Sequence, residues 1–458
     1  MSKQTKVAFI SLGCAKNLVN TEQMMALCRD AGMTLASAPE GADVAVVNTC
    51  GFIDSAKEEA IDNILAMGEL KKRGQLKKLL VTGCLAQRYK EEITESMPEV
   101  DGLLGTGSYG EIVSAVEDVL KDEKPRRFGS IHAPVEELDR VVITPPYTAY
   151  LRIAEGCDNH CAFCVIPSLR GKYRSRKWEN VLAEAKKLSD AGVREIIVIA
   201  QDITRYGADN YGKRRLPELI HELCKLDFHW VRLHYLYPDE FDDELIDAIA
   251  QEPKVLKYLD IPIQHCNDRI LRAMNRRGDK EYLLALFRKL RERIPGLVLR
   301  TSIITGLPGE GEAEFEELCD FLRAVKIERA GVFPYSPEDG TPAAKMERVD
   351  AEEAARRAEL LVDVQSRIMD EYNESLLGET VEVLCEGFDA ASMGYVGRSY
   401  AESIDIDGKI YFSSERDLQA GEFVQVRITG TMDGELTGEA VSFTLRDFFE
   451  AHENGRLT

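Results

Sequence analysis

The sequence predicts an α/β protein of several domains: a parallel-sheet α/β domain at the N-terminus, a partial barrel of six βα repeats, and a small antiparallel β-barrel. Three observations support this fold class. The chain has 458 residues, which is too many for one ordinary core. Most of it alternates apolar, β-rich runs with helical stretches, as parallel sheets covered by helices do. Its last part has short strands separated by glycines at roughly ten-residue spacing.

We expect the N-terminal domain to cover residues 1–135. The runs KVAFISLG, DVAVVNT and KLLVTG read as strands, and helical stretches follow them near residues 17–31, near 54–72 and from about 87. The stretch DEKPRRFGSIHAPVEELDR is polar and has no hydrophobic period. It therefore reads as the linker that closes this domain.

The second domain is expected over residues 136–377. Its six strands alternate with helical segments, which fits a partly open barrel because a closed barrel of this type needs eight repeats. A charged helical stretch, AEEAARRAELLVDVQSRIMDEYNESLLG, ends the domain. The predicted strands lie near residues 150–153, 195–200, 230–236, 258–261, 297–305 and 330–335.

The third domain is expected over residues 378–447, with a C-terminal tail at 448–458. The short runs TVEVLCEGF, MGYVGRSYA, KIYFSSE, FVQVRITGTM and ELTGEAVSFTL alternate apolar and polar residues and are interrupted by glycines. This spacing predicts a small, closed β structure.

Composition narrows the class of protein. No apolar run approaches the roughly 20 residues that span a bilayer, and the first residues lack the features of a signal peptide, so we expect a cytoplasmic protein without a membrane partner. In that compartment the eleven cysteines stay reduced, which favours metal binding or chemistry over disulfides. The net charge of −21 makes nucleic acid an unfavourable partner and a basic protein a better one.

Three thiols are clustered in the loop AEGCDNHCAFCVIP, as Cys157, Cys161 and Cys164. They follow the first strand of the barrel series, at the end of the sheet where such folds place active sites. Four thiolates complete a structural zinc or iron–sulfur site, whereas three leave one iron of a cubane without a protein ligand. The loop therefore predicts a cluster open to a cofactor or substrate. Two simpler interpretations stay open: a structural zinc with a distant ligand such as His160, and unliganded core cysteines.

Three further cysteines share the same position relative to a predicted strand. Cys14, Cys50 and Cys84 each lie just past the carboxyl end of a predicted strand of the N-terminal domain. Neighbouring strand ends of one parallel sheet can bring three such thiols together, which predicts a second open cluster. The other cysteines share no spacing and read as small buried hydrophobes: Cys28, Cys224, Cys266, Cys319 and Cys385.

The CxxxCxxC loop, with an aromatic residue, Phe163, before its last cysteine, resembles that of the radical S-adenosylmethionine enzymes. This resemblance implies a [4Fe-4S] cluster held by the three cysteines, with S-adenosylmethionine bound to its open iron and cleaved by one electron. It also implies cofactor contacts at Phe163 and at the glycines of TSIITGLPGE, Gly306 and Gly309, although a tight turn explains the two glycines almost as well. Gln201 and His234 end the next two strands, where they face the cofactor or simply cap strand ends.

Two sets of three cysteines with this layout, and a C-terminal domain similar to TRAM, resemble the methylthiotransferases. The resemblance implies that the cluster at Cys14, Cys50 and Cys84 carries the sulfur, that S-adenosylmethionine supplies both methyl group and radical, and that an electron donor, expected to be flavodoxin-like, reduces the enzyme. No further catalytic residue is assigned.

The family has two main branches, which modify an aspartate of a small-subunit ribosomal protein or an adenosine of transfer RNA. SLGCAKNLVNTE and GCDNHCAFCVIPSLRGKYRSR resemble the protein branch, whereas the transfer-RNA branch usually reads GCQMN at the first site. The departures, Asn20-Thr21-Glu22 for Asp-Ser-Glu and Ala162 for Ser or Thr, touch no expected ligand. The expected reaction is methylthiolation of an aspartate β-carbon in ribosomal protein S-twelve; the alternatives are the transfer-RNA reaction and a non-catalytic metal protein.

Charge gives an independent indication of the partner. Residues 379–447 carry 14 Asp and Glu against 5 Lys and Arg, so this domain is expected to attract a basic protein through side chains such as Asp405 and Asp407. A solvated acidic surface is the simpler explanation. In contrast, RGKYRSR is basic and lies beside the three-thiol loop, where it could neutralise a carboxylate or contact RNA. Its candidate substrate-binding residues are Arg170, Lys172, Arg174 and Arg176.

Overall fold

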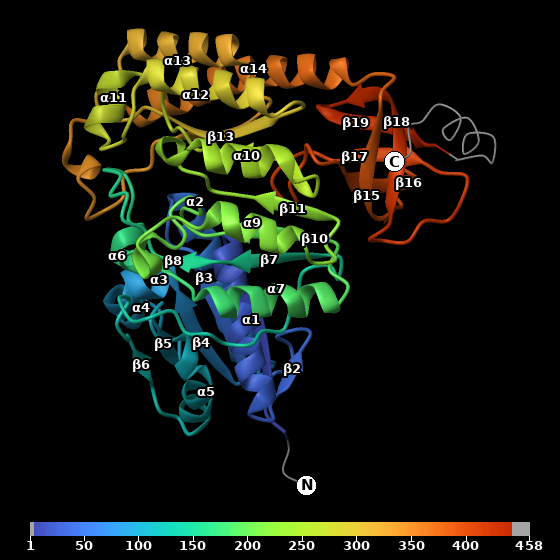
Figure 1. Cartoon of the computed structure of the whole chain (residues 1–458). Helices are drawn as coiled ribbons and strands as arrows, with labels where there is room; N and C mark the ends of the chain where they lie inside the picture. Colours follow the sequence, from blue (N-terminus) through green and yellow to red (C-terminus); the bar gives the residue numbers. More distant parts are fainter. Residues whose placement is uncertain (1–3, 442–458) are drawn as a thin grey trace.

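The computed structural model describes residues 4–441, so the predicted tail at 448–458 lies outside the described residues. Figure 1 shows three parts along the chain: an N-terminal α/β unit, a central layer of strands and helices, and a β-barrel at one side. The central unit lies between the other two and contacts both.

The N-terminal unit is built on a six-stranded parallel sheet in the order β2-β1-β3-β4-β5-β6. Its central strand is buried along its whole length, which explains the continuous apolar run in the sequence. The three predicted strands are present, and three short ones were not predicted. The strands are β1 (Lys6–Ser11), β2 (Thr34–Ala36), β3 (Val44–Thr49), β4 (Lys78–Gly83), β5 (Gly102–Leu104) and β6 (Arg126–Arg127).

Helices connect these strands and pack on both faces of the sheet, where two hydrophobic clusters form. Three of them begin just past the strand ends at which the cysteines lie. The helices are α1 (Ala15–Asp30), α2 (Asp54–Lys72), α3 (Cys84–Arg88), α4 (Lys90–Ser96) and α5 (Ile112–Leu120), with a 3-10 turn, η1, at Tyr109–Glu111.

The central unit contains a parallel sheet of six strands in the order β14-β13-β12-β11-β10-β7, so the predicted six-repeat, partial barrel is confirmed. A separate two-stranded ribbon of β8 (Ala154–Glu155) and β9 (Arg174–Ser175) brackets the three-thiol loop. The sheet strands are β7 (Thr148–Arg152), β10 (Glu195–Ile199), β11 (Trp230–Leu233), β12 (Val255–Asp260), β13 (Val298–Thr305) and β14 (Arg329–Pro334).

The helices of the central unit cover the outer face of this sheet and bury the largest hydrophobic cluster of the described chain. They are α6 (Ile166–Arg170), α7 (Trp178–Asp190), α8 (Ala208–Tyr211), α9 (Leu216–Cys224), α10 (Asp243–Gln251), α11 (Asp268–Ala273), α12 (Lys280–Arg293), α13 (Glu312–Val325) and α14 (Ala351–Ser375), with 3-10 turns η2 (Pro238–Glu240) and η3 (Ala343–Lys345).

The C-terminal unit is a closed barrel in the order β15-β16-β17-β19-β18. All pairings are antiparallel except that of β17 with β19, which is parallel. The exception arises because β18 already pairs with β15, so the hairpin partner β19 closes the barrel against β17. The strands are β15 (Thr380–Asp389), β16 (Gly394–Arg398), β17 (Ile410–Ser413), β18 (Phe423–Met432) and β19 (Glu435–Ala440).

The loop between β16 and β17 fastens this barrel to the central sheet. Arg398 donates to Glu195 Oε2 at 2.7 Å, and Arg232 donates to Glu195 Oε1 at 2.8 Å, with all three side chains almost fully buried. The hydroxyl of Tyr258 donates to Asp407 at 2.7 Å. On the side of the central unit these contacts come from strands β10, β11 and β12.

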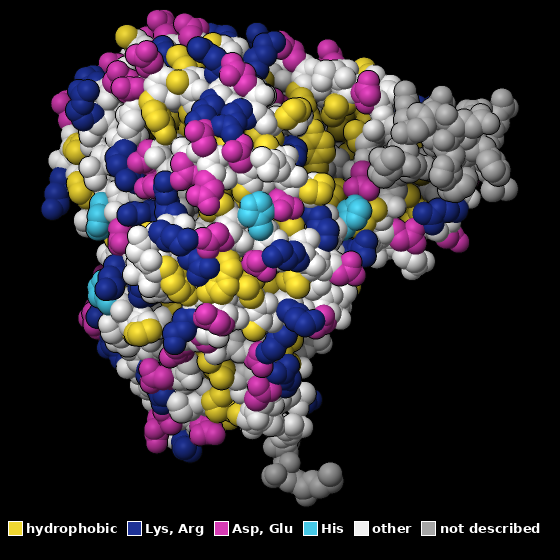
Figure 2. Space-filling model, viewed as in Figure 1, with side chains coloured by type: hydrophobic (Ala, Val, Ile, Leu, Met, Phe, Trp, Pro, Cys, Tyr) yellow, Lys and Arg dark blue, Asp and Glu magenta, His cyan; other side chains and the backbone are white. Residues whose placement is uncertain are grey.

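The surface in Figure 2 mixes basic and acidic side chains over the face that it shows.

Within residues 4–441, no helix has the length and apolar character needed to cross a membrane. The five cysteines outside the two sets of three pack in or against hydrophobic clusters, as predicted.

Candidate functional site

Three strand ends of the N-terminal sheet bring Cys14, Cys50 and Cys84 to one place. Cys14 caps the N-terminus of α1, Cys50 follows β3 directly, and Cys84 opens α3. Gly13 has a left-handed φ of +80°, and a Cβ added there would lie 2.5 Å from Cys50 Cβ. Only glycine allows the loops to approach this closely. We call these cysteines the N-terminal trio.

Cations surround the N-terminal trio. Burial opposes ionisation of Cys14, but the charges of Lys16 and Arg170 and backbone N–H groups outweigh it, so the pKa of this thiol is lowered. Burial raises the pKa of Cys50 to about 12 and also raises that of Cys84. One guanidinium nitrogen of Arg170 lies 3.5 Å from Cys84 Sγ. At Cys14 the neighbouring cations therefore favour the thiolate, which is the form of cysteine that binds iron.

The second set, the core trio, lies in the loop between β8 and α6. Backbone N–H groups of Asn159 and Ile166 point at Cys157 Sγ and Cys164 Sγ, each at 3.5 Å. Arg276 lies 3.5 Å from Cys161 Sγ. Burial raises the pKa of Cys157 to about 11 and also that of Cys164. Each sulfur thus has at most weak donors, and none is in a disulfide.

The two trios line one cavity of about 340 Å³. Within residues 4–441, no group of three His, Cys, Asp or Glu side chains converges closely enough to hold a single metal ion. Soft thiol donors in sets of three, spread around a cavity of this size, fit a polynuclear iron–sulfur group. The six thiols are Cys14, Cys50, Cys84, Cys157, Cys161 and Cys164.

Arg170 joins the two halves of the site. Its guanidinium is buried and donates to Glu155 Oε2 at 3.1 Å and to Asn20 Oδ1 at 2.9 Å, besides contacting Asn17 and Cys84. Glu155 also accepts from Arg152 at 2.9 Å and from Gln201 at 2.9 Å. Arg170 therefore serves the joint between the domains as well as the cavity.

A second cavity of about 260 Å³ adjoins the first, because both are lined by Phe52, Phe163, Gln264 and Ser302. Its other walls include Ile304, at the end of β13, and aromatic side chains near the end of β14. It lies next to the core trio and offers a mainly apolar space.

The predicted cofactor contacts fall into two groups. Phe163 and Gln201 line the shared cavity. His234 does not: it is buried, its Nε2 lies 3.0 Å from Ser403 Oγ, and burial lowers its pKa to about 3. Gly306 and Gly309 line neither cavity.

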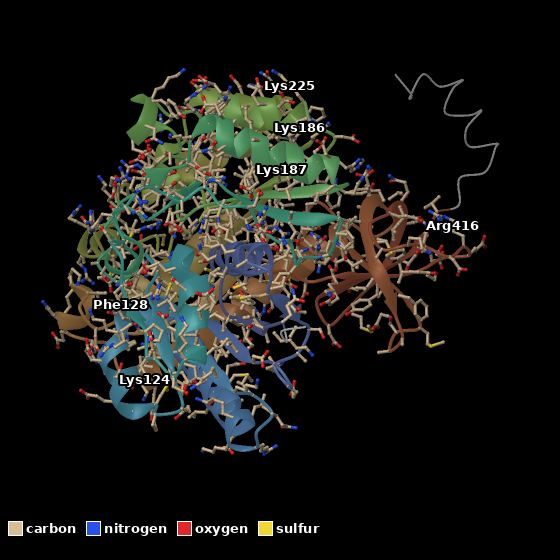
Figure 3. All side chains as sticks on the ribbon, turned by 90° about the horizontal axis from the view of Figure 1, so that it is seen from below. Lys124, Phe128, Lys186, Lys187, Lys225 and Arg416 are labelled. Carbon is tan, nitrogen blue, oxygen red and sulfur yellow. The ribbon has the colours of Figure 1, made fainter. Side chains whose placement is uncertain are left out.

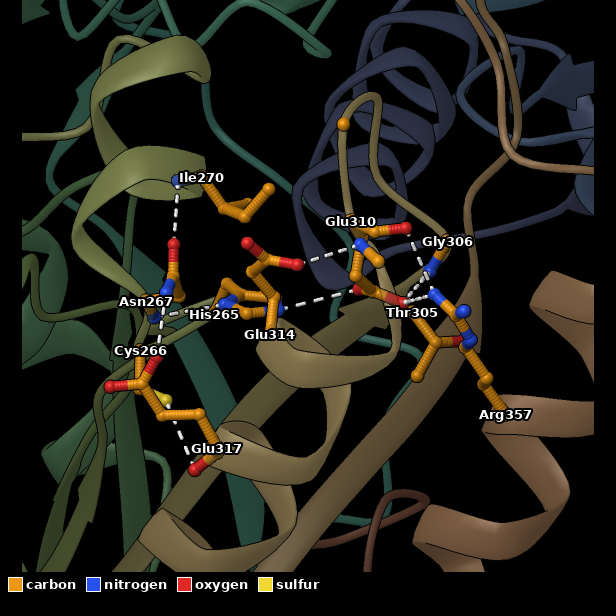
Figure 4. A network of polar contacts seen from close by, with 12 residues as sticks. His265, Cys266, Asn267, Ile270, Thr305, Gly306, Glu310, Glu314, Glu317 and Arg357 are labelled. Atoms are coloured by element: carbon orange, nitrogen blue, oxygen red, sulfur yellow. Dashed lines mark hydrogen bonds and ion pairs between the residues drawn. The ribbon is translucent and has the colours of Figure 1, made fainter.

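Gly306 and Gly309 instead lie in a turn that packs against α14 and against Arg269. A Cβ on Gly306 would collide with Ala354 of α14, and one on Gly309 would lie 3.0 Å from Arg269. Figure 4 shows the carboxylate of Glu310 between these elements. It accepts from Gly306 N and Arg357, both at 2.9 Å, and faces His265 Nε2 at 3.3 Å.

Of the six predicted substrate-binding residues, only Arg170 lines the cavity with the two trios. Arg170 lines the cavity, Lys172 is exposed, and Arg174 is half-buried and bonded to backbone carbonyls. Arg176 is buried in ion pairs with Glu137 and Glu184. In the barrel, Asp405 is exposed, whereas Asp407 is bonded to Tyr258 and to Ser403 N.

Several cavity residues were not predicted as site residues. Lys16 and Asn17 follow Cys14 directly, and Arg276, Arg300 and Asp260 come from the central unit. The position of Lys16 and Asn17 next to a cysteine of the trio was an available signal. Arg300 and Asp260, bonded at 2.8 Å, face inward from neighbouring strands, which the sequence does not reveal without the sheet order.

The family models match all three units. Residues 6–105 match "Uncharacterized protein family UPF0004", residues 151–322 match "Radical SAM superfamily" and residues 377–441 match "TRAM domain". The superfamily match implies a [4Fe-4S] cluster and S-adenosylmethionine.

Among solved structures, the chain resembles the radical S-adenosylmethionine methyltransferase TsrM from Kitasatospora setae. The TM-score is 0.56 at 14% identity, over 75% of this chain and 77% of that chain. This likeness concerns the fold alone.

Curated relatives are similar over nearly the whole chain. "Ribosomal protein uS12 methylthiotransferase RimO" of Lachnoclostridium phytofermentans is 48% identical, covering 95% of this chain and 100% of the relative. Proteins of the same name from Symbiobacterium thermophilum and Clostridioides difficile are 47% and 46% identical, covering 96% and 95% of this chain and 91% and 99% of the relatives. The chain therefore belongs to the radical S-adenosylmethionine methylthiotransferases, in the family of the ribosomal protein uS12 methylthiotransferase RimO.

Proposed function

We propose that this protein attaches a methylthio group to the β-carbon of an aspartate in ribosomal protein uS12. The observation that carries the proposal is the single cavity lined by both cysteine trios. The names of relatives that share close to half of its residues over the whole chain support the same reaction.

We infer two [4Fe-4S] clusters, one on each trio, with S-adenosylmethionine beside the core trio. When bound, these groups would supply the reducing electron, the hydrogen-abstracting radical and the methylthio group. The chain's own contribution is to hold six thiols around one buried space and to keep Lys16, Arg170 and Arg276 next to them. At Cys14 the charges of Lys16 and Arg170 outweigh the effect of burial and favour thiolate over thiol.

For the cofactor, we propose direct contact at Phe163 and Gln201, which line the cavity. His234, Gly306 and Gly309 would act differently, by holding the strand ends from which cavity residues project. The adjoining apolar cavity next to Phe163 has room for part of the cofactor.

For the partner, we propose a basic protein that meets the acidic barrel, with Asp405 free to contact it and Asp407 committed to the barrel joint. Lys172 and Arg174, beside the core trio, would meet the same substrate. An electron donor of the flavodoxin type would complete the reaction, which we place in the cytoplasm.

The surface cations lend little support to an RNA substrate. Figure 3 labels five basic side chains, and four of them have a carboxylate partner at 2.6 to 2.9 Å: Lys186 with Asp190, Lys187 with Asp139, Lys225 with Glu222 and Arg416 with Glu422. Paired charges attract phosphates weakly.

The test is a competition between substrates. Anaerobically reconstituted enzyme, with S-adenosylmethionine and a reductant, is offered uS12 and unmodified transfer RNA in one reaction, and both are analysed by mass spectrometry. We expect a methylthio group on an aspartate of uS12 only. Incorporation into the RNA alone would overturn the proposal.

A further inference from the structure

Four basic side chains line the cavity between the trios, and they differ in their partners. Arg170 pairs with Glu155 at 3.1 Å, and Arg300 pairs with Asp260 at 2.8 Å. Arg276 donates to the carbonyl of Pro262 and lies beside Cys161. The fourth is Lys16, and among residues 4–441 no Asp or Glu oxygen lies within ion-pairing distance of it.

Lys16 lies in the first turn of α1, two residues after Cys14, and only 8% of it is exposed. Its Nζ lies 3.3 Å from the centre of the Tyr235 ring. The Cys14 and Tyr235 side chains lie near this buried ammonium group and favour its charged form, but no carboxylate pairs with it among the described residues. Two weak acids and an aromatic face compensate for lost water only in part. The cavity beside Nζ is therefore a place where an anion would be stabilised.

Tyr235 is held firmly enough to form one wall of such a place. Its φ of +65° is rare for a residue with a side chain, and the strain is offset by contacts on both sides. Its N–H donates to Asp260 Oδ2 at 3.2 Å, and its carbonyl accepts from Ile203 N at 3.1 Å. A lysine of the N-terminal unit and a tyrosine of the central unit thus meet across the cavity.

We propose that Lys16 binds the side-chain carboxylate of the substrate aspartate and so makes the enzyme selective for a carboxylate substrate. The inference rests on the proposed function and adds the residue that recognises the substrate. The modified β-carbon is directly bonded to this carboxylate carbon, so holding the carboxylate at Nζ keeps the β-carbon in the space between the trios. A lysine suits this role because its three donors need no fixed plane.

Two carboxylates could reach this cavity: that of the substrate and that of the methionine part of the cofactor. Lys16 neighbours Cys14 of the N-terminal trio, whereas Arg276 neighbours Cys161 of the core trio. This separation assigns the substrate carboxylate to Lys16, and the experiment keeps the two carboxylates apart.

The experiment is a binding cycle on the reconstituted enzyme. Fluorescence anisotropy measures the Kd of a labelled uS12 peptide with its target aspartate and of the same peptide with asparagine there. The proteins are wild type, Lys16→Met, Lys16→Arg and, as a matched control, Lys72→Met, an exposed lysine of the same domain. Iron content and circular dichroism verify that each variant is folded and loaded.

We expect asparagine in the peptide to weaken binding to wild type and Lys72→Met by about tenfold or more, the usual cost of losing a charge-assisted hydrogen bond. Lys16→Met should bind the aspartate peptide more weakly than wild type does, by a similar factor. Its Kd values for the aspartate and asparagine peptides should differ by less than about twofold. Lys16→Arg should restore part of the preference. Formation of deoxyadenosine without peptide should be unchanged in Lys72→Met.

Two results would overturn the inference while leaving the proposed function intact: additive losses, in which Lys16→Met still prefers aspartate by the wild-type factor, or a loss confined to cofactor cleavage. If wild type modifies RNA and no aspartate peptide, the proposed function itself fails.

Discussion

Glu155 is the buried carboxylate that pairs with Arg152 and Arg170, the two arginines that reach α1 of the N-terminal unit, and Glu155→Gln tests its contribution to stability. Its two oxygens accept from Arg152, Arg170 and Gln201 at 2.9 to 3.1 Å. An amide of the same shape keeps the packing but leaves two buried guanidinium groups without a negative charge. Loss of one partner from a buried pair is strongly destabilising.

The pKa of Glu155 sets the magnitude. Burial alone would raise this pKa, but Arg170 and Arg152 more than offset it and lower it from 4.5 to about 2. A carboxyl group whose pKa is lowered in the folded state stabilises the fold at pH values above its pKa in the unfolded state. This stabilisation is lost as the pH falls toward the pKa of the folded state. The lowered pKa of Glu155 contributes about 3.4 kcal/mol to the free energy of unfolding at pH 7 and about 2 kcal/mol at pH 3.5.

The assay is urea unfolding of the metal-free proteins, followed by the fluorescence of Trp178 and Trp230, which both lie in the central unit. At pH 7 we expect the free energy of unfolding of Glu155→Gln to be about 3 kcal/mol lower than that of wild type. At pH 3.5 this difference should be about 1.4 kcal/mol smaller. Glu69→Gln, which removes an exposed partner of Lys72, is the control and should change neither value measurably. An equal difference in stability at the two pH values would show that the charge of Glu155 does not stabilise the fold.

Three further changes have defined outcomes. Gly13→Ala should lower iron from about eight to about four per chain, because the added Cβ displaces Cys50 from the N-terminal trio; full iron loading would contradict the geometry. Glu310→Ala should lower the free energy of unfolding by about 3–5 kcal/mol and speed hydrogen exchange at residues 264–267 and 306–311, because Arg357 and the Gly306 turn lose their shared carboxylate; unchanged exchange there would argue against the network. Glu338→Ala removes the partner that Lys57 and Arg88 of the N-terminal unit share, so exchange should rise at 335–341, and protection equal to wild type would show that this contact does not hold the domains together.

The convergence of the cysteines could be predicted because it follows from a local rule. In a parallel sheet the carboxyl ends of neighbouring strands lie at one edge, so the position of Cys14, Cys50 and Cys84 after successive strands was sufficient. The number of strands in the central sheet followed from the same alternation. Short strands such as β5 and β6 were missed because two or three residues carry no measurable period.

Contacts between distant segments could not be predicted. Gly306 looked like a place where a ligand approaches the backbone, yet Ala354 of α14 occupies that space. Arg170 looked like a substrate contact, and its partners Asn17 and Asn20 lie about 150 positions earlier. The parallel pairing of β17 with β19 depends on closure of the whole barrel, which no single strand encodes.

The most direct test of the central claim is iron and sulfide analysis of three proteins, each reconstituted without oxygen. We expect about eight irons in wild type and about four in each of two triple alanine variants, one lacking Cys14, Cys50 and Cys84 and the other lacking Cys157, Cys161 and Cys164. The first variant should still cleave S-adenosylmethionine without modifying uS12, and the second should do neither. Wild type that binds only four irons, or a first variant that still methylthiolates uS12, would contradict the claim that the two trios hold separate clusters with separate tasks.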